Sequence, residues 1–144
     1  MNSTTSIHNT SKTRALFEIN KGIPQHPEVD VNAKRSEEMR RVRFENMIYI
    51  ADGPSDIPAF SLVHKNGGST FAIYPPKDVK AFRQAERMRH DGRIDMYAEA
   101  DYSEGTTAFM RISNMIEEYA ERIYQKERLK FTESISSVPR HLIE

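Results

Sequence analysis

The sequence contains no cysteine and no tryptophan, and its charges leave no net excess of either sign. Without cysteine, disulfides, thiolate nucleophiles and cysteine-ligated zinc are excluded. The 21 basic and 21 acidic residues cancel, so no overall positive potential favours nucleic acid as a partner. No apolar run approaches the roughly 18 residues of a membrane span, and the N-terminus lacks the hydrophobic core of a signal peptide. These absences predict a cytoplasmic protein with neither nucleic acid nor membrane as a partner.

The length of 144 residues suits one domain with a modest core. A mean hydropathy of −0.69 is polar for a compact α/β domain, so we expect part of the chain to be exposed. Residues 1–10 are mostly Ser, Thr and Asn, which predicts a flexible leader, and residues 131–144 predict a loose tail. The domain itself is expected over residues 11–130.

Two acidic residues follow directly on an apolar segment. Residues 47–51 (MIYIA) are typical of a buried strand in a parallel sheet, and Asp52 stands where that strand would end. Asp56 follows at the expected start of a helix. Because ligands bind at the carboxyl ends of the strands in open α/β sheets, these two carboxylates could share one Mg²⁺ ion. The alternative is a turn aspartate followed by a capping aspartate, without any metal.

The residues between the two carboxylates predict how the chain turns there. Gly53 and Pro54 are expected to break the extended backbone, and Ser55 is the expected N-cap of the next helix. Further along, the patterns predict helix 58–65, which ends at Gly67-Gly68, then strand 69–74, helix 77–90, strand 94–98 and helix 106–130. The order β-α-β-α-β-α implies a parallel sheet with right-handed crossovers, a Rossmann-like α/β fold.

Apolar residues in the first and the last expected helix follow helical spacing. In the last helix they are Phe109, Ile112, Ile116, Tyr119, Ala120 and Ile123, a stripe that predicts core packing. A helix is also expected over Lys12 to Asn20, with Thr10 or Ser11 as N-cap and Gly22 as its stop. Its expected apolar residues are Ala15, Leu16 and Ile19.

The strand followed by Asp52-Gly53-Pro54-Ser55-Asp56 resembles the fourth motif of the haloacid dehalogenase-like superfamily, whose members are mostly Mg²⁺-dependent phosphatases. In that motif a hydrophobic strand is followed by an acidic residue, Gly, two variable residues and a second acidic residue. Similar residues downstream, Phe71-Ala72-Ile73-Tyr74 and Ala100-Asp101-Tyr102, extend the resemblance, which runs from about Ser11 to Ile123. It implies that Asp52 and Asp56 hold Mg²⁺.

The resemblance also covers a lysine at the start of a helix upstream. Lys12, in Lys12-Thr-Arg-Ala-Leu-Phe-Glu-Ile, is similar to the family's second motif, whose lysine contacts the phosphoryl oxygens and the nucleophilic carboxylate. A cation there would offset the charge of phosphate and carboxylate brought together. Lys21 and Lys34 are weaker alternatives. Without the downstream match, Lys12 would be a solvated lysine in a first helical turn.

Two parts of the family pattern have no counterpart in this sequence. The family's nucleophile is an aspartate in an Asp-x-Asp pattern after the first strand, and a Ser or Thr follows the second strand. The nearest triplet, Asp30-Val31-Asn32, has no apolar strand before it and lies in the polar connection between Ile23 and Asn46. We therefore expect the C-terminal portion of such a hydrolase, with the first strands missing and no activity of its own.

The resemblance implies a small phosphorylated substrate for the complete enzyme and favours phosphate esters over haloacids, but it does not identify the substrate. An alternative is a non-catalytic module that pairs its open sheet edge with a separate N-terminal half. A receiver-type signalling domain is a third hypothesis. It would need an acidic pair near its first strand, which the sequence does not provide.

Overall fold

The computed structural model describes residues 3–23 and 42–137, with side chains from residue 11 onward. The elements, in chain order, are α1 (Ser3–Lys21), η2 (Phe44–Asn46), β1 (Ile48–Ala51), η3 (Pro54–Asp56), α2 (Ile57–Lys65), β2 (Ser69–Tyr74), α3 (Val79–His90), β3 (Met96–Glu99) and α4 (Thr107–Ser136). They form two compact units, residues 1–102 and 103–144. The first unit contains all three strands.

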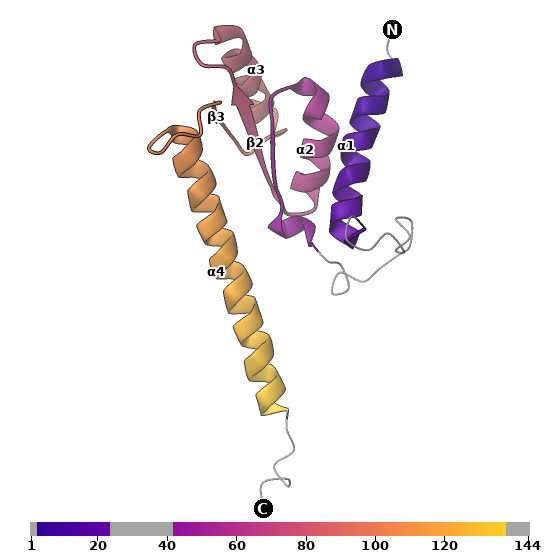
Figure 1. The fold of residues 1–144 in the computed structure, drawn as a ribbon, viewed down its shortest axis with the longest axis vertical. Coiled ribbons are helices and arrows are strands. Elements are labelled where there is room, and N and C mark those ends of the chain that lie inside the picture. The colour runs from indigo at the N-terminus through magenta and orange to yellow at the C-terminus, as the bar shows by residue number, and fades with distance from the viewer. Residues whose placement is uncertain (1–2, 24–41, 138–144) are drawn as a thin grey trace, which may run out of the picture. The chain divides into compact units, whose positions relative to one another are not determined.

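The strands form one parallel sheet in the order β1-β2-β3 (Figure 1). In its register Ile50 lies opposite Phe71, and Phe71 lies opposite Met96. The predicted α/β class, the parallel sheet and the alternation of strands with helices are therefore confirmed. The strand 69–74 has the predicted bounds, whereas β3 begins two residues later than expected.

Helices α2 and α3 cover the same face of this sheet. Phe60 of α2, Ala72 of β2 and Ala85 and Met88 of α3 belong to one buried cluster with Ile94. When parallel strands lie side by side in their sequence order and all crossovers have the same hand, successive helices lie on one face of the sheet. Because β1 and β2 are parallel, their carboxyl ends lie at the same end of the sheet, where the loops that carry Asp52 and Lys77 begin.

β1 is an outer strand of the sheet within the described residues. Its four residues are half-buried, not fully buried as residues 47–51 predict. An outer strand is paired on one edge alone, so its backbone presents unpaired polar groups on the other edge. Within the described residues, the sheet order therefore leaves one edge of β1 without a partner strand.

The start of α2 differs from the prediction. Pro54 opens the 3₁₀ turn η3, in which the Asp56 N–H donates to the Gly53 carbonyl over 3.0 Å. Ser55 therefore lies inside η3 and is not an N-cap, and α2 begins after Asp56, whose side chain does not cap it. At the other end, Gly67 has a φ of +87°, the left-handed conformation in which glycine commonly ends a helix, as predicted.

The first and the last helix of the chain are longer than expected. α1 begins at Ser3 rather than near Ser11, and α4 continues to Ser136 rather than Lys130. The expectation of a buried stripe on α4 is wrong for Phe109, Ile116 and Ile123, which are 39, 55 and 41% exposed. No helix among the described residues is long and apolar enough to span a bilayer.

Candidate functional site

Three side chains from separate elements meet at one carboxylate oxygen. The Lys12 ammonium on α1 donates a hydrogen bond of 2.6 Å to Oδ1 of Asp56, at the end of η3. The Tyr49 hydroxyl on β1 donates to the same oxygen over 2.9 Å. The structure therefore joins Lys12 and Asp56, which the sequence proposed as site residues, and adds Tyr49 to them.

Asp56 is buried, whereas its cationic partner reaches solvent. Asp56 is 1% exposed, while the Lys12 side chain keeps 37% of its surface exposed. An ammonium has three donor hydrogens, and one of them is used on Asp56, so the others remain for a second acceptor. Oδ2 of Asp56 receives no hydrogen bond from the described residues. A buried carboxylate oxygen without a donor is costly unless a ligand or water satisfies it.

Residues on one face of α1 fix the position of Lys12. Leu16 and Asn20 follow Lys12 at intervals of four residues, which places all three on one side of the helix. Leu16 joins the buried cluster around Phe44. The Asn20 side-chain amide donates to the Val42 carbonyl over 2.6 Å, and Asn20 is 1% exposed. Ala15 and Ile19 lie outside this buried face and are exposed, so the predicted apolar face is wrong for both of them.

Tyr49 is held between the sheet and α2. Its ring meets Phe60 edge to face, with centroids 5.4 Å apart. Burial raises the pKa of the Tyr49 hydroxyl well above its usual value, and the hydrogen bond to Asp56 and the charges of Asp56 and Asp52 act in the same direction. The phenol therefore stays protonated and continues to donate to Asp56.

Asp52 lies at the exposed end of β1, directly before the extended residue Gly53. Its charge contributes to the raised pKa of Tyr49, so its carboxylate acts on the same cluster. The predicted break in the backbone falls at Pro54, since Gly53 itself has extended angles.

The two carboxylates Asp52 and Asp56 would suit an open magnesium site better than a closed one. No group of three or more His, Asp or Glu side chains able to hold a metal occurs in the described parts of the chain. Mg²⁺ usually keeps several waters and binds one or two protein carboxylates together with phosphate oxygens. The exposed Asp52 and Oδ2 of Asp56 would suit such a partial set, whereas Oδ1 of Asp56 accepts hydrogen bonds from Lys12 and Tyr49.

Sequence reasoning missed Tyr49 and Asn20. Tyr49 and Ala51 are two residues apart, which places both on the same face of the strand. Asn20 is eight residues from Lys12, which places both on the same face of α1. Of the alternative lysines, Lys21 ends α1, and Lys34 lies with residues 24–41 outside the described ranges.

The chain is similar to a known protein over about three quarters of its length. The chain is 34% identical over 113 residues to an uncharacterized protein of Borreliella burgdorferi, an alignment that covers 76% of this chain and 37% of the relative. The chain thus spans little more than a third of the relative's length. No known protein family matches the sequence. No solved structure matches it.

Proposed function

We propose that the chain is the C-terminal portion of a haloacid dehalogenase-like hydrolase whose complete form hydrolyses phosphomonoesters with Mg²⁺ through an aspartyl-phosphate. The observation that carries the proposal is the contact between Lys12 and Asp56 beside the carboxyl end of β1. The two residues belong to separate motifs of the resemblance and are 44 positions apart. Asp56 stands at the N-cap position of α2, but its side chain makes no capping hydrogen bond there and accepts one from Lys12 instead.

In this proposal each side chain has a separate role. Asp52, exposed at the strand end, would be the direct ligand of Mg²⁺, and Asp56 would be a supporting ligand through Oδ2 or would orient the site. Lys12 would hold the phosphoryl oxygens, and Tyr49 would keep Asp56 in place. The bound Mg²⁺ would supply charge neutralisation at the transferred phosphoryl group.

The nucleophile would come from outside these 144 residues. An aspartyl-phosphate mechanism needs a carboxylate held in line with phosphorus, and the sequence has no Asp-x-Asp after an apolar strand. We therefore expect this chain alone to be inactive, and a complementary N-terminal half to be its partner in a cytoplasmic enzyme. The substrate would be a small phosphate ester.

The test joins the chain to the coding sequence upstream of Met1 and measures hydrolysis of p-nitrophenyl phosphate with and without Mg²⁺. We expect Mg²⁺-dependent activity that Asp52→Asn abolishes, while the 144-residue chain is inactive. Asp91→Asn, which removes an exposed carboxylate at the end of α3, is the matched control and should retain activity. An upstream sequence without Asp-x-Asp, or full activity in Asp52→Asn, would refute the proposal.

A second function is favoured by the outer position of β1. As a non-catalytic module, the chain would pair the open edge of β1 with a strand of another polypeptide, whose main-chain groups would satisfy that edge. Size-exclusion chromatography of the purified chain, alone and after co-expression with the upstream segment, tests this function. A stable 1:1 complex without phosphatase activity supports it, and a well-behaved monomer that ignores the segment argues against it.

A further inference from the structure

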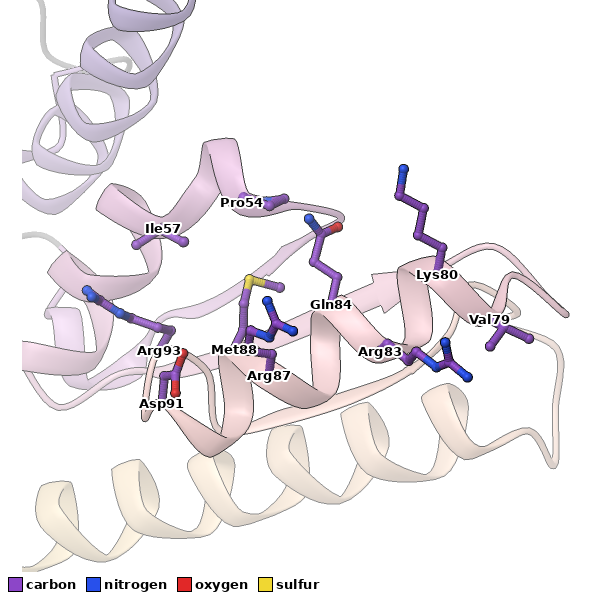
Figure 2. A pocket seen from close by; sticks show the side chains of 10 residues that line it. All are labelled: Pro54, Ile57, Val79, Lys80, Arg83, Gln84, Arg87, Met88, Asp91 and Arg93. Carbon is purple, nitrogen blue, oxygen red and sulfur yellow. The ribbon is translucent and has the colours of Figure 1, made fainter.

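A groove of about 740 Å³ lies between α3 and the segment that joins β1 to α2 (Figure 2). It belongs entirely to the first unit. Its lining residues are Pro54, Ile57, Val79, Lys80, Arg83, Gln84, Arg87, Met88, Asp91 and Arg93. Lys12, Asp52 and Asp56 are not among them, so the groove is distinct from the site of the proposed phosphatase.

The side of the groove formed by α3 is strongly basic. Lys80, Arg83 and Arg87 recur at intervals of three and four residues, which aligns them on one face of the helix, and Arg93 follows in the next loop. All four are exposed, and none has a carboxylate within ion-pair distance in the described parts of the chain. Asp91 is the single acid in the lining. A chain of zero net charge thus concentrates unpaired cations here.

The groove also has an apolar side. Figure 2 shows Met88 and Gln84 projecting from α3 toward the segment that carries Pro54 and Ile57. Met88 is 6% exposed and Ile57 is half-buried, so they form a floor beneath the charged side chains. A ligand that fills this groove must therefore bring apolar groups as well as negative charge.

We propose that this groove binds an acidic peptide segment of a partner protein, with apolar side chains on Met88 and Ile57 and carboxylates against Lys80, Arg83 and Arg87. From residue 80 to residue 87 the helix rises about 10 Å, which is the length of two helical turns or three extended residues. A segment of that length can present several carboxylates to the row. Nucleic acid would satisfy the cations, but its backbone offers nothing apolar for the floor, and the neutral chain gives it no wider attraction.

The experiment selects peptides from a random 12-residue phage library on the immobilised 144-residue chain. Synthetic copies of the enriched peptides are then measured by fluorescence anisotropy against three proteins: the unchanged chain, Arg83→Glu/Arg87→Glu, and Arg89→Glu. Arg89 is exposed on the same helix but outside the groove, so it controls for charge reversal on α3. Lys80→Glu serves as a milder second variant, and the unfolding midpoint of each variant is compared with that of the unchanged chain.

We expect enriched peptides that combine Asp or Glu with apolar residues. Their affinity should fall at least about tenfold in the double variant and severalfold in Lys80→Glu, and Arg89→Glu should change it less than about twofold. Failure to enrich any peptide, enrichment without acidic residues, or equal losses in Arg89→Glu would overturn the inference. Tighter binding of a fluorescein-labelled single-stranded 12-nucleotide DNA, lost in the same double variant, would overturn it in favour of nucleic acid.

Discussion

The Lys12 ammonium nitrogen lies 2.6 Å from Oδ1 of Asp56, although 44 positions of sequence separate the two residues. The contact ties α1 to the loop that follows β1. It therefore serves the fold and the candidate site together, because the same salt bridge that holds α1 also keeps a cation beside a strand end. The two roles can be separated by experiment, since stability is measured without substrate.

Loss of the Lys12 charge should destabilise the chain. In Lys12→Met the buried Asp56 keeps the Tyr49 hydrogen bond but loses its cationic partner, and hydrogen bonds to charged groups contribute about 1.5–3 kcal/mol. Because Lys12 is 37% exposed, solvent screening should keep the loss toward the lower end of that range. Urea unfolding measures it.

Arg14→Met is the matched control on the same helix. Arg14 pairs with Glu18 over 3.0 Å, four residues on, and the Arg14 side chain is 69% exposed. Exposed pairs of this spacing contribute about 0.3–0.5 kcal/mol. If Lys12→Met cost no more than Arg14→Met, the Lys12–Asp56 contact would not be a stabilising one in solution.

The raised pKa of Tyr49 predicts a loss of stability at high pH. Since the folded state raises the pKa above its usual value of about 10, the folded chain holds this proton more tightly than the unfolded chain does. The contribution is fully present below pH 10 and is lost as pH rises above that value. Unfolding free energies measured from pH 8 to 11 should therefore fall above pH 10.

Tyr49→Phe separates this effect from the ionisation of the other tyrosines. The variant keeps the ring contact with Phe60 but has no hydroxyl, so its stability should fall less steeply above pH 10. Tyr97, whose pKa is also raised by its hydrogen bond to Glu86, stays in both proteins and sets the common background. Parallel pH profiles for the two proteins would contradict the prediction.

Local patterns in the sequence were sufficient for most of the first unit. The strand 69–74 and the glycine stop at Gly67 follow from composition and turn chemistry acting over a few residues, and the structure has both. Ser55 was misplaced because Pro54 starts a 3₁₀ turn that the helix signal alone does not distinguish from the first turn of α2. Other predictions, such as the apolar face of α1, failed where long-range contacts decide the outcome.

The candidate site shows the same limit. Asp52 and Asp56 are close in sequence, so their spacing could be interpreted at once, whereas the use of Asp56 by Lys12 and Tyr49 depends on how α1 packs. On α1 helical spacing allowed several faces, and the polar Asn20, buried by its bond to Val42, helped to choose among them. The buried face of α1 carries the polar residues Lys12 and Asn20, so a search for apolar residues at helical spacing does not identify it.

Gly68 should not tolerate a side chain. A Cβ atom there would lie 2.5 Å from the Phe44 carbonyl oxygen and 2.5 Å from Cγ1 of Val63, too close for either to remain in place. Gly68→Ala should cost about 1–3 kcal/mol, as other overpacked substitutions do. Thermal unfolding followed by circular dichroism measures the loss.

Gly53→Ala is the control for Gly68→Ala and also tests the site. A Cβ at Gly53 would meet no atom within 4 Å, and its backbone is extended, so stability should change by less than about 0.5 kcal/mol. In the phosphatase proposed above, a fall in activity without a fall in stability would indicate that substrate approaches this backbone closely. A large loss of stability in Gly53→Ala would contradict the open space at this position.

Asp95 connects the starts of two strands, and its removal should weaken the sheet. Its Oδ2 accepts hydrogen bonds from the backbone N–H of Thr70 at 2.8 Å and from the Thr70 hydroxyl at 3.0 Å, and Thr70 is fully buried. Asp95→Ala leaves these donors without a partner, at a cost of about 1–3 kcal/mol. Asp91→Ala, which removes an exposed carboxylate nearby in sequence, should cost less than about 0.5 kcal/mol in the same urea titration. Since His64 contacts the other oxygen of Asp95 from an exposed position, His64→Ala should cost less than Asp95→Ala. The reverse order would show that the contact with His64, and not the one with the buried Thr70, carries the stability.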